Sequence, residues 1–180
     1  LDQTELIKTM TYLNERFPSL KRIGIYSNAS NVLAKTHEEL TALEELRLGI
    51  AYLGLESGSD IVLQKVKKPA TAEEQINAVQ KLSAAGIKTS VMVLLGLGGT
   101  ELSEEHALRI AEVANQMHPR YLSFLTVMLI PGTHLYREHE TGKFVLPDET
   151  GLIKELRLIV ENLELKKTVL RANHASNYLP

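Results

Sequence analysis

Residues 50–60 read Ile-Ala-Tyr-Leu-Gly-Leu-Glu-Ser-Gly-Ser-Asp, and this stretch decides the fold. An apolar run ends in one carboxylate, Glu56, and a flexible polar turn and the apolar-spaced residues 61–63 follow. This order predicts a strand, a charged strand end and the start of a helix. Parallel sheets and barrels bind ligands at the carboxyl ends of their strands, so Glu56 is a candidate ligand-binding residue. The alternative is that Glu56 accepts hydrogen bonds from the amides of residues 58–60 and only shapes the turn.

The alternation of strand and helix patterns continues along the chain. Apolar runs predict strands at residues 22–28, 50–57, 87–95 and 121–130. Helical apolar spacing fills the segments between them, and capping boxes that begin at Thr36 and Thr71 open two of the helices. No strand-to-strand gap is short enough for a hairpin, so each connection is a right-handed crossover. We therefore expect an α/β fold, a partial (β/α) barrel or small open sheet with about four parallel strands.

The composition is that of one ordinary globular domain. The 180 residues are 44% apolar and carry a formal charge of −2, which is enough apolar material for a core. We expect a single domain over residues 1–180, with βα repeats to about residue 145 and a C-terminal helix and tail over 146–180. There is no basic excess to indicate nucleic-acid binding, and no apolar run approaches the length of a membrane span. A cytoplasmic protein is the default expectation.

The chain contains no cysteine. This excludes disulfides, a cysteine nucleophile and any thiolate-held zinc or iron–sulfur site within these residues. The chain begins inside a helical pattern and stops on Leu179-Pro180, so it reads as a piece of a longer protein.

Polar or glycine-rich residues follow each of the four predicted strands. They are Tyr26-Ser27-Asn28, Glu56-Ser57, Gly96 to Thr100, and Pro131-Gly132-Thr133. In a parallel sheet these segments share one rim, where glycine exposes backbone amides and a carboxylate can hold ribose hydroxyls. Each loop alone fits an ordinary tight turn, but the four together favour a ligand-binding rim.

Several familiar catalytic patterns are absent. The Gly-x-Gly-Gly loop at residues 96–99 lacks the spacing of a dinucleotide fingerprint and the Gly-Lys-Ser/Thr of a P-loop. His134 and His139 are five residues apart, not the four that would align them on one helix face for a metal. His37, His106 and His118 are predicted at helix surfaces or helix ends. Ser103 is predicted to cap the helix that follows the glycine loop.

Three segments resemble one known family. Residues 52–68, Tyr-Leu-Gly-Leu-Glu-Ser-Gly-Ser-Asp followed by Ile and Val-Leu-Gln-Lys-Val-Lys-Lys, resemble the fourth-strand region of radical S-adenosylmethionine (radical SAM) enzymes. Residues 85–99 and 129–135 are similar to the fifth- and sixth-strand regions. The tail at 174–180 is similar to a motif in an Fe–S oxidoreductase branch related to oxygen-independent coproporphyrinogen III oxidase.

The resemblance implies a fragment of a (β/α)6 barrel that binds S-adenosylmethionine. In the family, a CxxxCxxC loop after the first strand holds a four-iron four-sulfur cluster, and S-adenosylmethionine on that cluster gives a 5′-deoxyadenosyl radical. This chain has no such loop, so the cluster is expected in the full-length protein and not on these residues. The expected partners are a small-molecule substrate and the missing N-terminal part of the same protein, with no nucleic acid and no membrane. The chain alone is expected to be inactive.

The resemblance also implies particular site residues. The positions that match cofactor-facing strand ends are Ser27, Asn28, Glu56, Ser57, Gly96, Gly98, Ile130 and Pro131. Two tail residues, His174 and Asn177, either close over the substrate or pack the tail. The resemblance implies neither a catalytic residue nor a metal ligand among these residues.

Two other functions fit the same residues. One is a (β/α)-barrel lyase or isomerase that binds a small phosphorylated metabolite, although the predicted rim is poor in lysine and arginine. The other is a non-catalytic scaffold domain, which would not need a carboxylate and glycine rim.

Overall fold

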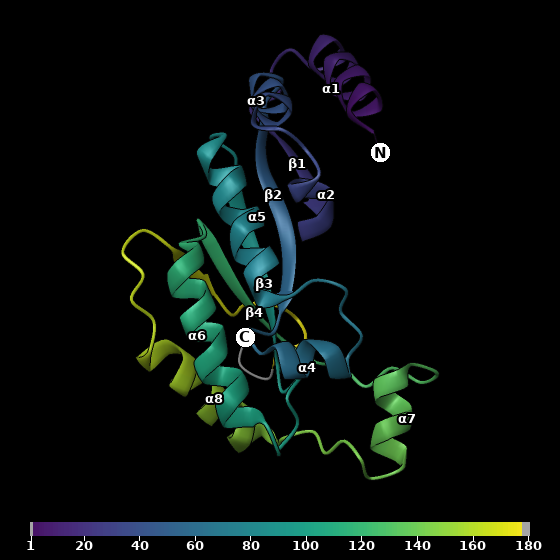
Figure 1. Cartoon of the computed structure of the whole chain (residues 1–180), viewed down its shortest axis with the longest axis vertical. Coiled ribbons are helices and arrows are strands. Elements are labelled where there is room, and N and C mark those ends of the chain that lie inside the picture. The colour runs from purple at the N-terminus through teal and green to yellow at the C-terminus, as the bar shows by residue number, and fades with distance from the viewer. Residues whose placement is uncertain (1, 178–180) are drawn as a thin grey trace.

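A computed structural model describes residues 2–177, which form one parallel sheet with helices packed along it (Figure 1). The strands pair in chain order, and they are β1 (Ile23–Ser27), β2 (Leu48–Glu56), β3 (Lys88–Leu95), β4 (Tyr121–Thr126) and β5 (Val169–Arg171). The helices are α1 (Gln3–Arg16), α2 (Ala29–Leu33), α3 (His37–Glu45), α4 (Asp60–Lys65), α5 (Ala72–Ala84), α6 (Ser103–Met117), α7 (His134–Glu140) and α8 (Glu149–Glu161). The predicted parallel α/β fold is therefore confirmed.

The fifth strand was not among the four predicted. β5 has three exposed residues and pairs in parallel with β4, with Ser123 opposite Arg171. The Arg171 guanidinium lies 4.3 Å from the centre of the Tyr121 ring on β4, so a cation–π contact helps to hold this strand.

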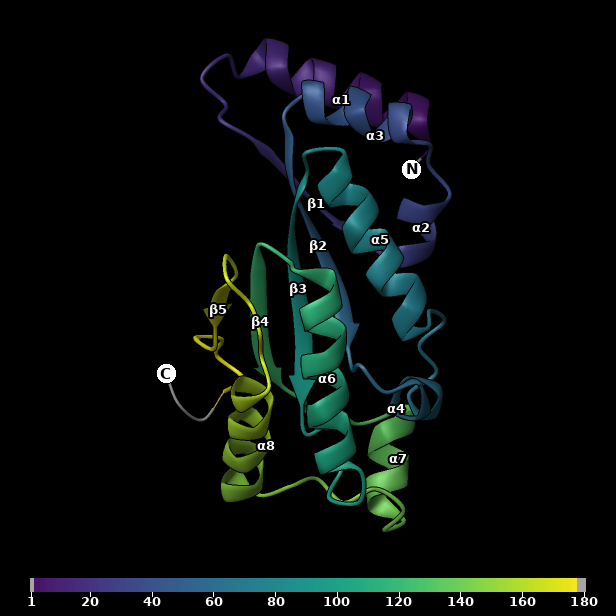
Figure 2. The ribbon, with the colours of Figure 1, turned by 60° about the vertical axis from the view of Figure 1, so that its left-hand side comes forward.

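Helices α5, α6 and α8 lie along the same face of the sheet (Figure 2). Alternate side chains of the central strands point toward these helices. They include Val93 and Phe124, which pack in one buried cluster with Ile110 and Ile159. A second buried cluster lies between strands β1 and β2 and helices α1, α2, α3 and α5. Among residues 2–177, no helix has the length and apolar character needed to cross a bilayer.

All the strands point the same way, so their carboxyl ends form one rim of the sheet. Helices α4 and α7 lie beyond this rim, and α1 and α3 lie at the opposite end of the sheet (Figure 2). The predicted gathering of the strand ends on one edge is confirmed by this topology.

The helix starts are as predicted in two cases and different in a third. Thr36 and Thr71 both form complete capping boxes. Ser103 does not cap α6, because it is the first helical residue and Leu102 occupies the cap position without a side-chain bond. The Ser103 hydroxyl instead donates to the carboxylate of Glu155.

Gly58 permits a close approach between the rim and α6. A Cβ atom at this position would overlap the carbonyl group of Arg109, which is backbone and cannot rotate away. We expect Gly58→Ala to lower the free energy of unfolding by about 3 kcal/mol, measured by urea denaturation. The matched control is Gly142→Ala, because Gly142 has open space around it and only a left-handed backbone to strain. Its expected cost is about 1 kcal/mol, and equal losses would contradict the tight packing of the turn on α6.

Candidate functional site

Glu56 ends β2 in an uncommon backbone conformation. Its φ is 63°, in the left-handed region, and the Ser57 amide donates to the Leu55 carbonyl at 2.7 Å across it. The pairing of β2 with β3 shifts register between Gly54 and Glu56, which opposes two residues of β2 to one of β3. A left-handed L-residue costs about 1–2 kcal/mol, and such strain collects at functional sites.

The carboxylate of Glu56 folds back over the strand. It lies above Gly54, where a Cβ atom would overlap Glu56 Oε1. Lys68 Nζ lies 3.2 Å from the same oxygen, and both side chains keep about a quarter of their surface exposed. Glu56 is thus a half-buried carboxylate that a ligand at the rim can reach.

The turn after β2 is shaped by Ser57 and not by Glu56. The Ser57 side chain is fully buried, and its Oγ accepts the Ser59 amide hydrogen at 3.0 Å. The same Oγ lies 2.7 Å from Nδ1 of His106. Ser57 therefore stands behind Glu56, inside the protein.

His106 is buried, and its predicted place on a helix surface or end is wrong. The ring on α6 has no exposed surface, and its Nε2 lies 3.0 Å from the Leu94 carbonyl oxygen. A carbonyl only accepts hydrogen bonds, so the ring hydrogen is assigned to Nε2 and Nδ1 accepts from the Ser57 hydroxyl. Burial lowers the pKa of His106 from 6.5 to about 4, so the ring is neutral at pH 7.

Glu155 brings α8 into the same group. Its carboxylate accepts the Gly96 amide hydrogen at 2.7 Å and the Ser103 hydroxyl hydrogen, and its Oε1 lies 3.7 Å from His106 Nε2. Burial raises the pKa of Glu155. We call the side chains of Ser57, Ser103, His106 and Glu155 the polar cluster; Ser103 is half-buried and the other three are buried. The cluster joins the ends of β2 and β3 to α6 and α8.

The two glycines predicted at the rim are closely packed. Gly96 has a φ of 81°, and a Cβ atom on it would lie 2.8 Å from Leu152 Cδ2. A Cβ atom on Gly98 would lie 3.0 Å from the Cβ atom of His106. With the Gly96 amide bonded to Glu155, these glycines serve the packing of the loop on α6 and α8.

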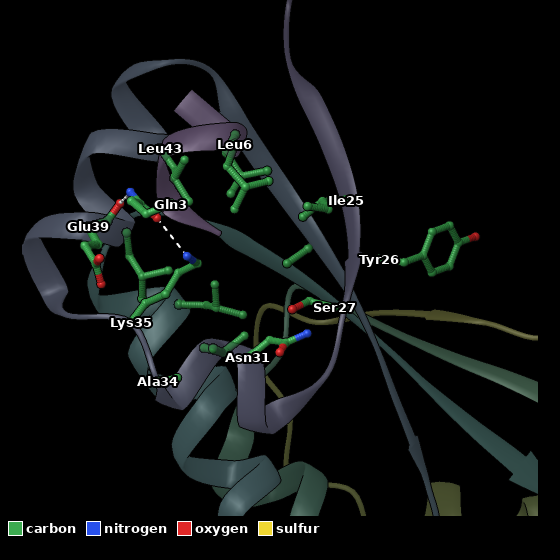
Figure 3. Close-up of a pocket in the computed structure, with 15 residues that line it drawn as sticks. Gln3, Leu6, Ile25, Tyr26, Ser27, Asn31, Ala34, Lys35, Glu39 and Leu43 are labelled. Carbon is green, nitrogen blue, oxygen red and sulfur yellow. Dashed lines mark hydrogen bonds between the residues drawn. The ribbon is translucent and has the colours of Figure 1, made fainter. Parts of the chain in front are cut away.

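Asn28 lies near Glu56, because it lines a small pocket with Gly54, over which the Glu56 carboxylate lies, and with Lys68, which pairs with that carboxylate. Asn28 caps α2, with its Oδ1 accepting from the Asn31 amide and the Ser30 hydroxyl at 2.9 Å each. Ser27 lines a cavity of about 400 Å³ between β1 and the N-terminal helices, in which Lys35 donates to Gln3 (Figure 3).

The loop after β4 offers apolar surface at the rim. Ile130 is 54% exposed and Pro131 follows it. The loop is held by Thr133, whose hydroxyl donates to the Ile130 carbonyl at 2.7 Å.

Asn177 packs the tail against the end of β4. Its Nδ2 donates to the Phe124 carbonyl at 2.8 Å, and its Oδ1 accepts from the Thr126 hydroxyl at 3.0 Å. His174 is exposed and pairs with Ser176 in the same tail. The end of the tail motif, residues 178–180, lies outside the described residues.

An iron–sulfur cluster does not fit the side chains of this chain. The sequence has no cysteine, and no three His, Asp or Glu side chains among residues 2–177 come together as a metal site. Glu56 does fit a ligand with hydroxyl or ammonium groups, because a carboxylate accepts hydrogen bonds from both.

Known proteins are similar to this chain at two levels, in sequence family and in fold. The sequence model of the radical SAM superfamily matches residues 1–114. No curated protein sequence matches the chain. Among solved structures, an N-terminally truncated Elp3 from Methanocaldococcus infernus is 20% identical with a TM-score of 0.68, over 88% of this chain and 36% of that one.

Two further structures have the same fold. Coproporphyrinogen III oxidase (HemN) from Escherichia coli is 17% identical with a TM-score of 0.65, over 89% of this chain and 36% of that one. Methylornithine synthase (PylB) is 16% identical with a TM-score of 0.62, over 99% of this chain and 57% of that one. The chain therefore spans about a third to a little over half of the length of these proteins.

The strain at Glu56 predicts a difference between two substitutions. Both Glu56→Ala and Glu56→Gly remove the ion pair with Lys68, but only glycine relieves the left-handed backbone. We expect Glu56→Gly to be about 1 kcal/mol more stable than Glu56→Ala in urea denaturation. An alanine variant as stable as the glycine variant would mean that the backbone at this position is not strained.

Acidification is expected to destabilise the fold through His106. Its pKa is lower in the folded chain, about 4, than the 6.5 of an exposed ring, so stability falls as the pH drops between these values. The full difference is about 3 kcal/mol. Glu155 acts in the opposite direction, because its raised pKa favours the folded state as it takes up a proton.

A comparison with His106→Leu isolates the histidine. Both proteins contain Glu155, so we expect the stability advantage of wild type over His106→Leu to shrink as the pH is lowered from about 7 to about 4. Chemical denaturation at a series of pH values measures this difference. An advantage that stays constant over the series would contradict the neutral buried ring.

Proposed function

Because this chain belongs to the radical SAM superfamily, we propose that it is the C-terminal part of an Fe–S oxidoreductase and that its strand ends hold S-adenosylmethionine. Members of the superfamily are enzymes. The proposed partner is an N-terminal part of the same polypeptide that carries the cluster-binding cysteines. The proposed substrate is a small molecule.

The observation that carries the proposal is a carboxylate, Glu56, that a strained backbone holds at the end of β2. Glu56 keeps a left-handed backbone and stands over Gly54 at the rim. A carboxylate there can accept hydrogen bonds from ribose hydroxyls or from the ammonium group of S-adenosylmethionine. Lys68 neutralises it in this structure, so a bound ligand would share Glu56 with Lys68 or displace it.

Other rim residues would complete the contact surface. Ile130 and Pro131 offer apolar surface suited to a flat base. Ser57 would act behind Glu56, since its hydroxyl is buried and bonded to His106. When bound in the full-length protein, S-adenosylmethionine would supply the radical chemistry, and Glu56, Ile130 and Pro131 would hold and orient its nucleoside.

A phosphorylated metabolite is less well supported as the ligand. Phosphate requires free amide donors and a nearby cation. The Gly96 amide is bonded to Glu155, and Lys68 is paired with Glu56.

The proposal predicts that Glu56 is needed for cleavage of S-adenosylmethionine. The full-length protein would be purified without oxygen, reconstituted with iron and sulfide, and assayed for reduction-dependent formation of 5′-deoxyadenosine. We expect Glu56→Ala to lower the rate at subsaturating S-adenosylmethionine about tenfold or more, which equals the loss of about 1.4 kcal/mol of binding.

The matched control is Glu101→Ala, because Glu101 is an exposed carboxylate that also pairs with a lysine. It should cleave like wild type. If Glu56→Ala cleaves S-adenosylmethionine as fast as wild type, Glu56 is not part of the binding site. If the full-length protein forms neither the cluster nor 5′-deoxyadenosine, the proposed function is overturned.

A further inference from the structure

We propose that His106 is a positioning residue that holds Glu56 in its ligand-binding orientation through the hydroxyl of Ser57. The inference rests on the proposed function, in which Glu56 contacts S-adenosylmethionine. It assigns a role in ligand binding to a buried helix residue that does not touch the ligand.

One ring joins two adjacent strand ends. His106 Nδ1 lies 2.7 Å from the hydroxyl of Ser57, just after β2, and Nε2 lies 3.0 Å from the carbonyl of Leu94 on β3. The two nitrogen atoms of an imidazole have a fixed separation, so the ring sets the spacing between these strand ends. That spacing decides where the rim groups of β2 and β3 stand relative to one another.

Glu56 depends on its neighbours for its backbone conformation. Leu55 and Ser57, on either side of it, are completely buried. Ser57 holds the turn by three hydrogen bonds: its amide to the Leu55 carbonyl, its Oγ from the Ser59 amide, and its hydroxyl to His106. A left-handed residue persists only where the surroundings enforce it, so loss of the His106 bond frees Glu56 to relax.

The cluster resembles a serine–histidine–carboxylate nucleophile, but it is closed to any substrate. Ser57 and His106 have at most 1% of their surface exposed, and Glu155 has 2%. The histidine Nε2 hydrogen is held by the Leu94 carbonyl, and Glu155 accepts from Gly96 and Ser103. Burial and committed hydrogen bonds leave positioning as the role that this geometry can perform.

The substitutions at His106 can separate its two bonds. Asparagine places its oxygen near the position of Nδ1 and keeps an acceptor for Ser57, whereas leucine removes both partners. His118→Leu is the matched control, because His118 is the exposed residue that ends the same helix.

The experiment measures the dissociation constant of S-adenosylmethionine on the full-length, cluster-reconstituted protein. We expect His106→Leu and Ser57→Ala each to weaken binding about tenfold, and the double variant to be no weaker than either single variant. His106→Asn should restore most of the affinity, and His118→Leu should bind like wild type. Hydrogen exchange without ligand gives an independent reading, in which the amides of Ser57 and Ser59 should exchange faster in His106→Leu than in His106→Asn.

The outcomes separate this inference from the proposed function. If Glu56→Ala weakens binding but His106→Leu and Ser57→Ala do not, the positioning role is wrong and the proposed function stands. If His106→Asn and His106→Leu behave alike in both binding and exchange, His106 only fills space. If the wild-type protein does not bind S-adenosylmethionine, the proposed function fails, and hydrogen exchange alone decides whether His106 positions the turn.

Discussion

The hydrogen bond between Ser57 and His106 is the contact on which the rim of this sheet depends. Parallel strands are joined along their length by backbone bonds, but their carboxyl ends diverge into separate loops. Here a single buried ring bridges two of those ends, and Glu155 adds the glycine loop and α8 to the same group. Buried polar groups are costly unless they are satisfied, so the cluster favours this one arrangement of loops over looser alternatives.

Much of the fold could be predicted because its signals are local. Apolar runs and capping boxes mark the strands and helices, and the connection lengths require parallel pairing. β5 was not predicted because it has only three residues, all exposed, and is held by Tyr121 on the neighbouring strand β4. No periodicity can be detected in so short a segment.

The candidate site was only partly predictable. The position of Glu56 at a strand end follows from the apolar run before it, but its left-handed backbone depends on tertiary contacts. The burial of His106 did have a signal, because it shares a helix face with Ile110, Val113 and Met117, which are all buried. What no local pattern reveals is the partner, because Ser57 lies 49 residues away in the sequence.

The most direct test of this account is a crystal structure of the full-length protein, grown without oxygen and with S-adenosylmethionine bound. If Glu56 holds the ligand, its carboxylate will lie within hydrogen-bonding distance of the ribose hydroxyls or the ammonium group, with the Ser57–His106 bond intact behind it. S-adenosylmethionine bound away from the β2 end, with Glu56 still paired only to Lys68, would contradict it.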